Sequence, residues 1–377
     1  MRRTTASIAA LGATMVLGLA ACDSGSGSNP GVDESSASAG TDAACSLADP
    51  PTSTVPPPGS DAGRASGAVA VVVDSSTAVT SDPQTVANDL DSALRQAGLR
   101  PRVRVTAADP TALLSGARAV IGSGARFLVL DTLDARTGAR VERIAARAGV
   151  TVVDFDHPVP GGTAPYLVSY DEEGAGRLQA QSLVDCLTAQ GVTDPKLIML
   201  DGGLDIDQNA VLFAMGVHEV LDPLVSAGRA TVVEAEVTSW TLADAAASFQ
   251  QALTAAGGKV DGVLAADDHL AETVLGVLNG LGRKSRVMIA GQGSGVPGLR
   301  QVRDGRQTLT VVEDGALEAR AAAQLVSALA RGQSPESAGL SLRPFPDPQS
   351  DGHRLEALLL PAQVVTQANL AGAGQGS

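Results

Sequence analysis

The sequence predicts an α/β protein with two doubly wound parallel-sheet lobes that are joined by a hinge. Three observations lead to this prediction. After residue 67, short apolar runs alternate with helical patterns, which is typical of a parallel sheet with helices on both faces. A Pro- and Gly-rich segment at residues 157–162 interrupts the alternation, and a second series follows it. The length of 377 residues is enough for two domains of ordinary size.

The first series begins with residues 68–74 (AVAVVVD), a continuous apolar run that predicts a strand buried on both faces. Apolar residues then recur at helical spacing from Val86 to Ala97, and Gly98 suits the left-handed cap of that helix. The remaining elements of this series are strands at residues 103–106, 127–130 and 150–155, with helices that start near Asp109 and Asp134.

The second series starts after the interruption and continues almost to the end of the chain. Strands are predicted at residues 166–169, 197–200, 231–235, 262–265, 287–290, 309–312 and 355–360. Helices are predicted after Asp171, Asp207, Thr241, Asp267 and Val296, and at residues 315–331. Because open α/β sheets bind ligands outside the carboxyl ends of their strands, we expect the functional cleft between the two lobes.

The N-terminus carries an export signal. A basic start (Met1-Arg2-Arg3) precedes an apolar stretch that is too short for a permanent membrane span, so residues 1–21 are predicted to be a signal peptide. The sequence LAAC at residues 19–22 resembles the lipobox of bacterial lipoproteins, which implies lipidation of Cys22. The alternative is a plain secretory signal that happens to contain a cysteine. With lipidation, the protein is exported and anchored on the outer face of the cell membrane.

Residues 22–65 are predicted to be a lipidated Cys followed by a disordered tether, because Ser, Gly, Asp and Pro dominate them. Two further cysteines, Cys45 and Cys186, remain. In an oxidising compartment they could form a disulfide between tether and body, or stay as two unpaired thiols, and the sequence leaves both open. The four His residues show no ligand spacing with them, so no metal site is expected.

Charge and motifs exclude several function classes. The formal net charge of −14 opposes binding to nucleic acid. Residues 291–295 (GQGSG) lack the third Gly of a dinucleotide loop and the Lys of a P-loop, so a strand-to-helix turn is the better interpretation. No catalytic triad is visible, and the acidic pairs are more typical of helix caps or ligand acceptors. We therefore expect no enzyme activity, no catalytic residue and no cofactor.

The second half of the chain carries a family resemblance. The segments that carry it are residues 202–216, with a Gly-rich turn and the helix start DQNAV; Trp240; residues 260–268 (VDGVLAADD); residues 289–293 (IAGQG); and residues 307–311 (QTLTV). With these segments the chain resembles the periplasmic sugar-binding proteins, most closely the xylose-binding type, from about residue 67 to 370. In the first lobe, residues 153–157 (VDFDH) and 170–176 (YDEEGAG) are similar to family segments.

The resemblance implies the type I periplasmic-binding-protein fold. It places lobe 1 at residues 66–158 plus about 313–335, and lobe 2 with the hinge crossings at residues 159–312 plus about 336–370. It also implies a ligand site made of Asp156, His157, Gln208, Asn209, Trp240, Asp267, Asp268, Gln292 and Glu313. Carboxylates and amides would satisfy sugar hydroxyls, and an aromatic ring would cover a sugar face.

Several positions depart from the family pattern. The family's arginine after the first-lobe Asp is His157 here, its cleft Asn is Asp267, and the Asp after its Gly-Gln is Gly293. Its lysine position falls on Val312 or Glu313. Because the expected cations are gone and acids remain, we expect an acidic cleft that prefers a polyol, an amino sugar or another neutral-to-cationic solute. The alternative is a cleft that has lost ligand binding.

The sequence therefore predicts a monomeric, lipid-anchored substrate-binding component of an ABC importer. Its partners would be a small solute (sugar, polyol or amino sugar) and a separate ABC permease in the membrane. Closure of the lobes around the solute would favour docking on the permease. A sensory lipoprotein that reports a solute to a membrane receptor or kinase stays open as the alternative.

Overall fold

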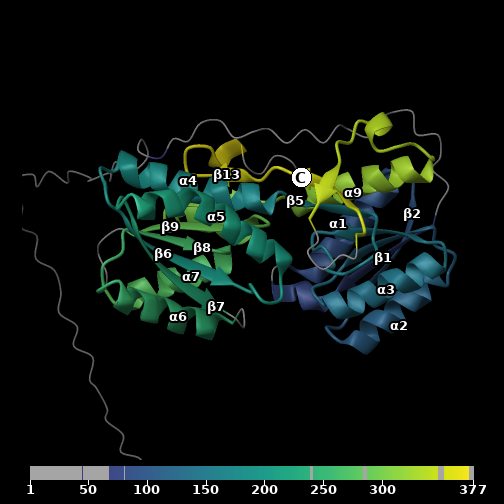
Figure 1. Ribbon diagram of the computed structural model, residues 1–377, viewed down its shortest axis with the longest axis horizontal. Helices are drawn as coiled ribbons and strands as arrows, with labels where there is room; N and C mark the ends of the chain where they lie inside the picture. The colour runs from purple at the N-terminus through teal and green to yellow at the C-terminus, as the bar shows by residue number, and fades with distance from the viewer. Residues whose placement is uncertain are drawn as a thin grey trace, which may run out of the picture. The chain divides into compact units, whose positions relative to one another are not determined.

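The computed structural model describes Cys45 and residues 68–79, 81–237, 241–282, 287–346 and 352–372. In this part of the chain the predicted alternation of strands and helices forms two sheets, so the predicted fold class is confirmed (Figure 1). Lobe 1 contains a seven-stranded sheet in the order β11-β12-β5-β4-β3-β1-β2. Lobe 2 contains a six-stranded sheet in the order β13-β10-β9-β8-β6-β7.

Lobe 1 is a parallel sheet with one short antiparallel edge strand, β11, and helices on both faces. One face packs under α1 and α9, and the other packs under α2 and α3. The elements are β1 (Ala68–Asp74), α1 (Pro83–Gln96), β2 (Arg100–Thr106), α2 (Pro110–Ile121), β3 (Phe127–Asp131), α3 (Ala135–Arg147), β4 (Thr151–Phe155), β5 (Tyr166–Tyr170), α9 (Gly315–Ala330), β11 (Arg343–Phe345) and β12 (Leu355–Leu360).

Lobe 2 repeats this plan. Helices α4 and α5 cover one face of its sheet and α6 and α7 cover the other (Figure 1). The elements are α4 (Glu172–Ala189), β6 (Lys196–Gly202), α5 (Gln208–Ser226), β7 (Thr231–Val237), α6 (Leu242–Ala255), β8 (Gly262–Ala265), α7 (Asp268–Gly280), β9 (Met288–Gly293), α8 (Val296–Arg303), β10 (Leu309–Val312) and the antiparallel edge strand β13 (Gln363–Val365). One continuous apolar cluster joins the core beneath α1 and α9 to the core beneath α4 and α5.

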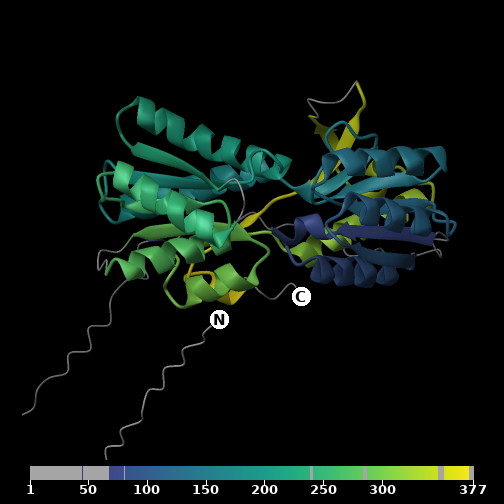
Figure 2. The same cartoon turned by 90° about the horizontal axis from the view of Figure 1, so that it is seen from below.

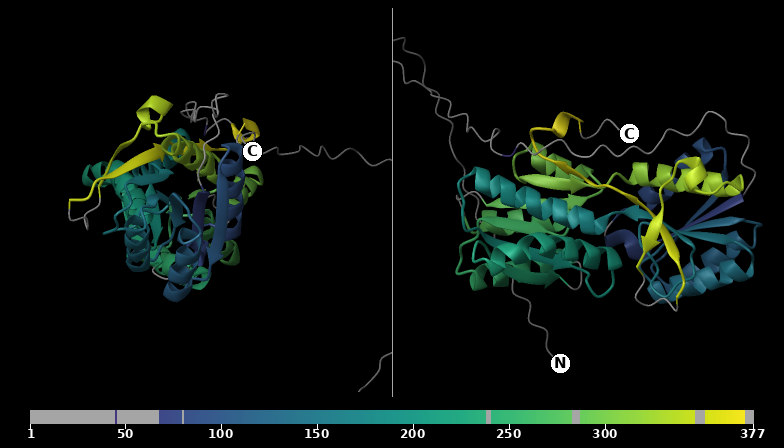
Figure 3. Two further views of the ribbon diagram at one scale, coloured as in Figure 1. Left: turned by 90° about the vertical axis from the view of Figure 1, so that its right-hand side faces the viewer. Right: turned by 45° about the horizontal axis from the view of Figure 1, so that its top comes forward.

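The chain crosses between the two sheets at three places, of which the one after β10 lies where it was predicted and the other two do not. The segment at residues 157–162 is a loop within lobe 1, because β4 pairs in parallel with β5 of the same sheet. The described crossings lie at Asp171, at residues 313–314 and at residues 361–362. Figure 2 and the right panel of Figure 3 show the yellow chain after β12 as it passes from one sheet to the other.

Two predicted lobe boundaries are therefore wrong. Strands β5 and β12 pair with each other in lobe 1, whereas the sequence placed both in lobe 2. The cause is the connection between β4 and β5, which returns to the same sheet through a loop instead of the usual helix. The short strands β11 and β13 were not predicted at all.

Asp side chains cap the helices that begin at the crossing edge of the sheets. Asp171, Asp207, Asp267 and Asp314 accept hydrogen bonds from backbone N–H groups in the first turns of α4, α5, α7 and α9. Each cap satisfies N–H groups that lack partners within the helix, and each carboxylate lies at the positive end of a helix dipole. The fold thus places several carboxylates side by side at the ends of parallel strands.

Helices α4 and α5 approach each other through two glycines. A Cβ on Gly176 would overlap the carbonyl of Phe213, and a Cβ on Gly216 would overlap the carbonyl of Glu173. The backbones are therefore in direct contact, which only residues without a side chain permit. Because both helices start at the crossing edge of the lobe 2 sheet, this contact sets the position of their first turns.

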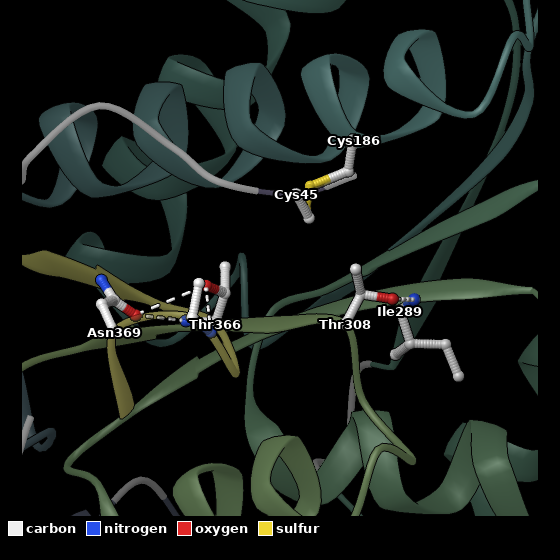
Figure 4. The surroundings of a disulfide bond; sticks show 7 residues. Cys45, Cys186, Ile289, Thr308, Thr366 and Asn369 are labelled. Carbon is white, nitrogen blue, oxygen red and sulfur yellow. Dashed lines mark hydrogen bonds between the residues drawn. A yellow bond between two sulfur atoms is a disulfide. The ribbon is translucent and has the colours of Figure 1, made fainter. Parts of the chain in front are cut away.

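Cys45 and Cys186 form a disulfide in the structure, with a Cα–Cα distance of 4.9 Å. Cys186 lies on α4, on the side that faces the lobe 2 sheet, as Figure 4 shows. It is 1% exposed and belongs to the apolar cluster beneath that helix. The bond therefore fastens residue 45 to lobe 2. Cys22, the predicted signal peptide and the rest of the predicted tether lie outside the described residues.

Candidate functional site: an acidic cavity between the lobes

A cavity of about 750 Å³ lies between the lobes. Its wall is built from the starts of α1, α4, α5, α7, α8 and α9 and from the ends of β4, β5 and β9. Neither Lys nor Arg occurs among the described residues that line it, and His157 and His269 are its two imidazoles. The lining carboxylates are Asp82, Asp89, Asp156, Glu172, Asp207, Asp267, Asp268, Glu313, Asp314 and Glu318. The cavity is therefore strongly acidic.

His157 is a buried cation at the lobe 1 wall. It is 3% exposed, and its Nδ1 lies 2.9 Å from Oδ1 of Asp131 at the end of β3. Burial lowers the pKa of His157, but the charges of Asp156 and Asp207 and the hydrogen bond to Asp131 outweigh this effect and raise that pKa to about 10. Burial raises the pKa of Asp131 to about 6 despite the hydrogen bond from His157. At neutral pH the two groups are thus an ion pair.

Asp156 connects the two lobes through its backbone. Its φ of 62° lies in the left-handed region, which Asp tolerates better than bulkier residues do. Its carbonyl accepts hydrogen bonds from Ser169 Oγ at 2.7 Å and from Asn209 Nδ2 at 3.0 Å. Asn209 belongs to lobe 2, so this second bond spans the cleft. His157 Nε2 and Asp207 Oδ2, 4.0 Å apart, form a second link across it.

Asp131, Asp156 and His157 lie close enough together to hold a metal ion, since their ligand atoms are within 4.8 Å of one another. In the structure these groups pair with one another, since Nδ1 of His157 lies 2.9 Å from Oδ1 of Asp131 and 3.6 Å from Oδ2 of Asp156, and a metal would have to displace the proton of the imidazole. The arrangement therefore suits an ion pair better than a metal centre.

The first turn of α7 contains two acids with different roles. Asp267 caps the helix through Leu270 N at 2.6 Å and faces the cavity. Asp268 is 3% exposed, and its Oδ1 accepts hydrogen bonds from Gln307 Nε2 at 2.8 Å and Thr310 Oγ1 at 2.9 Å. Burial raises the pKa of Asp268 to about 7, against these hydrogen bonds. Because its oxygens are already engaged, Asp268 fixes α7 on the sheet.

The hinge side of the cavity carries three more carboxyl groups. Glu313 lies at a crossing and accepts a hydrogen bond from Gln292 Nε2 at 2.5 Å. Glu172 opens α4 and is 6% exposed, and Glu318 lies in the first turn of α9 and is 4% exposed. Burial raises the pKa of Glu313 to about 8 and raises the pKa values of Glu172 and Glu318 well above their usual range, and neighbouring carboxylates add to all three shifts.

Comparison with known proteins identifies the family. A family model described as a periplasmic binding protein domain matches residues 70–334, which is more than half of the chain. The chain belongs to the type I periplasmic sugar-binding family. It is 32% identical over 219 residues to the D-xylose-binding periplasmic protein of Escherichia coli, a match that covers 58% of this chain and 64% of that protein.

Two further comparisons agree. The D-xylose-binding periplasmic protein of Haemophilus influenzae is 30% identical over 241 residues, which cover 64% of this chain and 71% of that protein. A solved ABC transporter solute-binding protein from Clostridium phytofermentans, with bound β-D-glucose, superposes with a TM-score of 0.70 at 19% identity. That match covers 81% of this chain and 95% of the other, and it shows a shared fold.

The structure brings most of the predicted site residues of this sugar-binding family member together. The cavity lining includes Asp156, His157, Asn209, Asp267, Asp268, Gln292 and Glu313. Gln208 is not part of the described lining, although it neighbours Asn209. Trp240 lies outside the described residues. Contact of these side chains with a ligand stays a prediction.

The sequence analysis missed Asp131, Glu172 and Glu318 as parts of the site. Asp131 is the last residue of β3, and Glu172 and Glu318 stand in the first turns of α4 and α9. Acids are common at helix N-termini in contact with solvent, because the helix dipole favours them there. The signal that could have found them is their position at the carboxyl ends of parallel strands. That signal becomes useful only when each strand is assigned to its lobe, because the assignment shows which strand ends lie at the same edge.

Proposed function

We propose that this chain is the lipid-anchored solute-binding component of an ABC importer and that it captures a sugar or sugar-like solute between its lobes. The observation that carries the proposal is the cavity of about 750 Å³ that both lobes line and into which both contribute carboxyl groups. This volume is in the range of small-molecule sites, about 300–1,000 Å³. A wall of carboxylates and amides suits a ligand that presents many hydroxyl donors.

The crossings support a capture mechanism by domain closure. Three short segments join the lobes, and the hydroxyl of Tyr170 donates a hydrogen bond to the Asp314 carbonyl at 3.0 Å, which ties two of these segments together. Such a hinge allows the lobes to rotate about a fixed region while each stays rigid. Closure would exclude water from the solute and strengthen its hydrogen bonds. The names of the relatives describe binding of a sugar and no chemical reaction. We therefore infer that this chain releases its solute chemically unchanged.

Binding is tested by a thermal-shift screen of the full chain with pentoses, hexoses and polyols, followed by calorimetry on the solutes that raise Tm. We expect Asn209→Ala to weaken affinity about tenfold, because it removes an amide from the wall and one interlobe hydrogen bond. Gln208→Ala is the matched control, since its neighbouring amide is outside the lining. A chain that binds none of these solutes or their amino derivatives would contradict the proposed function. Loss of solute uptake by cells without the chain would support import over sensing.

The anchor is tested separately through Cys22. A lipidated Cys22 should place the chain in the membrane fraction, and Cys22→Ser should move it to the aqueous fraction because no acyl chain can then be attached. Among the described helices, none is both long and apolar enough to cross a bilayer. Cys45→Ser, which changes the other N-terminal thiol, should leave the chain with the membrane. Equal partition of Cys22→Ser and the unchanged protein would exclude the anchor.

A further inference from the structure

The hinge side of the cavity contains a cluster of three carboxyl groups that we name the hinge triad: Glu172, Glu313 and Glu318. They come from three separate places in the chain, namely the start of α4, the second crossing and the first turn of α9. All three line the cavity, and the charge of Glu313 contributes to the raised pKa values of both Glu172 and Glu318. Burying three like-charged groups together is unfavourable unless a cation or a proton compensates them.

The described residues offer the hinge triad little compensation. Oε1 of Glu313 and Oε1 of Glu318 are buried, and neither has a hydrogen-bond partner among the described residues. Water cannot easily take that place at Glu318, because the whole residue is only 4% exposed. The cavity lining contains neither Lys nor Arg in its described part. The buried cation, His157, is already paired with Asp131 at 2.9 Å. Two acceptor atoms therefore remain at the hinge without a donor.

We propose that the hinge triad binds the protonated amino group of a polyhydroxylated amine, so that the preferred solute is an amino sugar or an aminopolyol. This inference rests on the proposed function and names the solute class. An ammonium group carries three donors and one positive charge, which suits an acidic wall that contains two unpartnered carboxyl oxygens. The other polar groups of the wall, such as Asn209 and Asp267, remain available for the hydroxyl groups.

Charge decides between the solute classes. A sugar acid would add a negative charge to a cavity that already has ten lining carboxyl groups, and repulsion would oppose its entry. A neutral sugar donates hydrogen bonds but brings no charge, so the hinge triad would keep the protons that compensate its repulsion. A cation replaces those protons, because it pairs with the carboxylates directly. Proton release on binding therefore distinguishes an amine from a neutral sugar.

Several titratable groups surround the hinge triad and contribute to its protonation. Lobe 1 and the crossings place Asp131, Asp156, His157, Tyr170, Asp171 and Asp314 nearby, and lobe 2 places Asp207 there. Most of these groups are acids, which hold protons on the hinge triad in the free protein. The pKa of Glu313, raised to about 8, means that the amine should bind with release of protons at pH 7.

The test is calorimetry of the full chain at pH 7 with amine and parent pairs. The amines are 2-, 3- and 6-amino-deoxy-D-glucose and 1-amino-1-deoxysorbitol, and the parents are D-glucose and sorbitol, with N-acetylglucosamine and glucuronate as neutral and anionic analogues. We expect at least one amine to bind ten or more times tighter than its parent. Titrations in buffers of different ionisation enthalpy should show net proton release for that amine and none for the parent.

The variant Glu318→Gln removes one acid and should reduce the preference for the amine over its parent about tenfold. Glu272→Gln is the matched control, because it changes the net charge equally on an exposed part of α7. Glu172→Gln gives a second variant if Glu318→Gln does not fold. A parent sugar that binds as tightly as every amine overturns the inference and leaves the proposed function intact. Binding of no solute in this panel overturns the inference, and the proposed function falls with it only if the pentoses, hexoses and polyols of the first screen also fail to bind.

Discussion

Gly216→Ala should destabilise lobe 2 strongly, at the upper end of about 1–3 kcal/mol or above it. The added Cβ would overlap the backbone of Glu173 and Arg177 on α4, and backbone atoms cannot move aside as a flexible side chain can. The helices would have to separate along their whole contact. Since α4 begins with Glu172 and α5 begins beside Asn209, the same separation would move two walls of the cavity. We therefore expect weaker solute binding as well as a lower free energy of unfolding.

Urea unfolding of Gly216→Ala is the measurement, with Gly276→Ala as the control. Gly276 lies within α7 with open space around the position of a Cβ, so Ala there should be neutral or stabilising by up to about 1 kcal/mol. Gly176→Ala should behave like Gly216→Ala, and the double variant should cost less than the sum, because the first substitution already separates the helices. Equal effects of Gly216→Ala and Gly276→Ala would show that α4 and α5 do not depend on backbone contact.

The free energy of unfolding should be greatest in mild acid and should fall as pH rises towards 10. Several buried groups have raised pKa values in the folded state. Burial raises that of Glu313 from 4.5 to about 8 and those of Asp201 and Asp268 from 3.8 to about 7. Burial likewise raises that of Glu142 from 4.5 to about 7.

The direction of the effect follows from proton binding. A group with a raised pKa holds more protons in the folded state than in the unfolded state, so its contribution is complete below the unfolded value and is lost as pH passes the folded value. For the carboxyl groups this window is about pH 4–8. For His157, whose pKa rises from 6.5 to about 10, it extends to about pH 10. Both windows act in the same direction.

Thermal unfolding between pH 5 and pH 9 measures this dependence. Glu313→Gln should flatten it, since Gln needs no proton to remain buried, and should raise stability at pH 9 relative to the unchanged chain. Glu336→Gln, on an exposed turn, should leave the slope as it is. The measurements should be repeated in high salt, because repulsion among surface charges is screened there and buried groups are screened less. A Tm that increases from pH 5 to pH 8 would contradict the raised pKa values of these buried groups.

The sequence predicted most elements of the fold because hydrophobic periodicity and helix caps are local signals. The start of α7 after Asp267 and the cap of α6 by Thr241 are confirmed by hydrogen bonds at 2.6 and 3.2 Å. Lobe membership is not local. Strand β12 pairs with β5 across more than 180 residues, and nothing in either segment specifies that partner. The loop at residues 157–162 resembled a crossing because it replaces a helix.

The candidate site could likewise be predicted only where local signals specify it. Asp156, Asn209 and Gln292 could be predicted because they follow strands or open helices within segments similar to the family. The role of Asp268 could not, because its hydrogen bonds to Gln307 and Thr310 depend on how β10 packs beside α7. The unpartnered oxygens of the hinge triad also depend on tertiary structure, since an acid such as Glu318 usually contacts water in a first helical turn.

The disulfide has a mechanical consequence. Cys45 is bonded to α4 of lobe 2, whereas the chain enters lobe 1 at Ala68. Any tension applied to the chain before residue 45 is therefore delivered to lobe 2, and lobe 1 carries no part of that load. Under the proposed anchoring, lobe 2 would be held by the membrane and lobe 1 would move relative to it. Reduction of the disulfide would transfer the load to β1, so that lobe 1 would be held and lobe 2 would move.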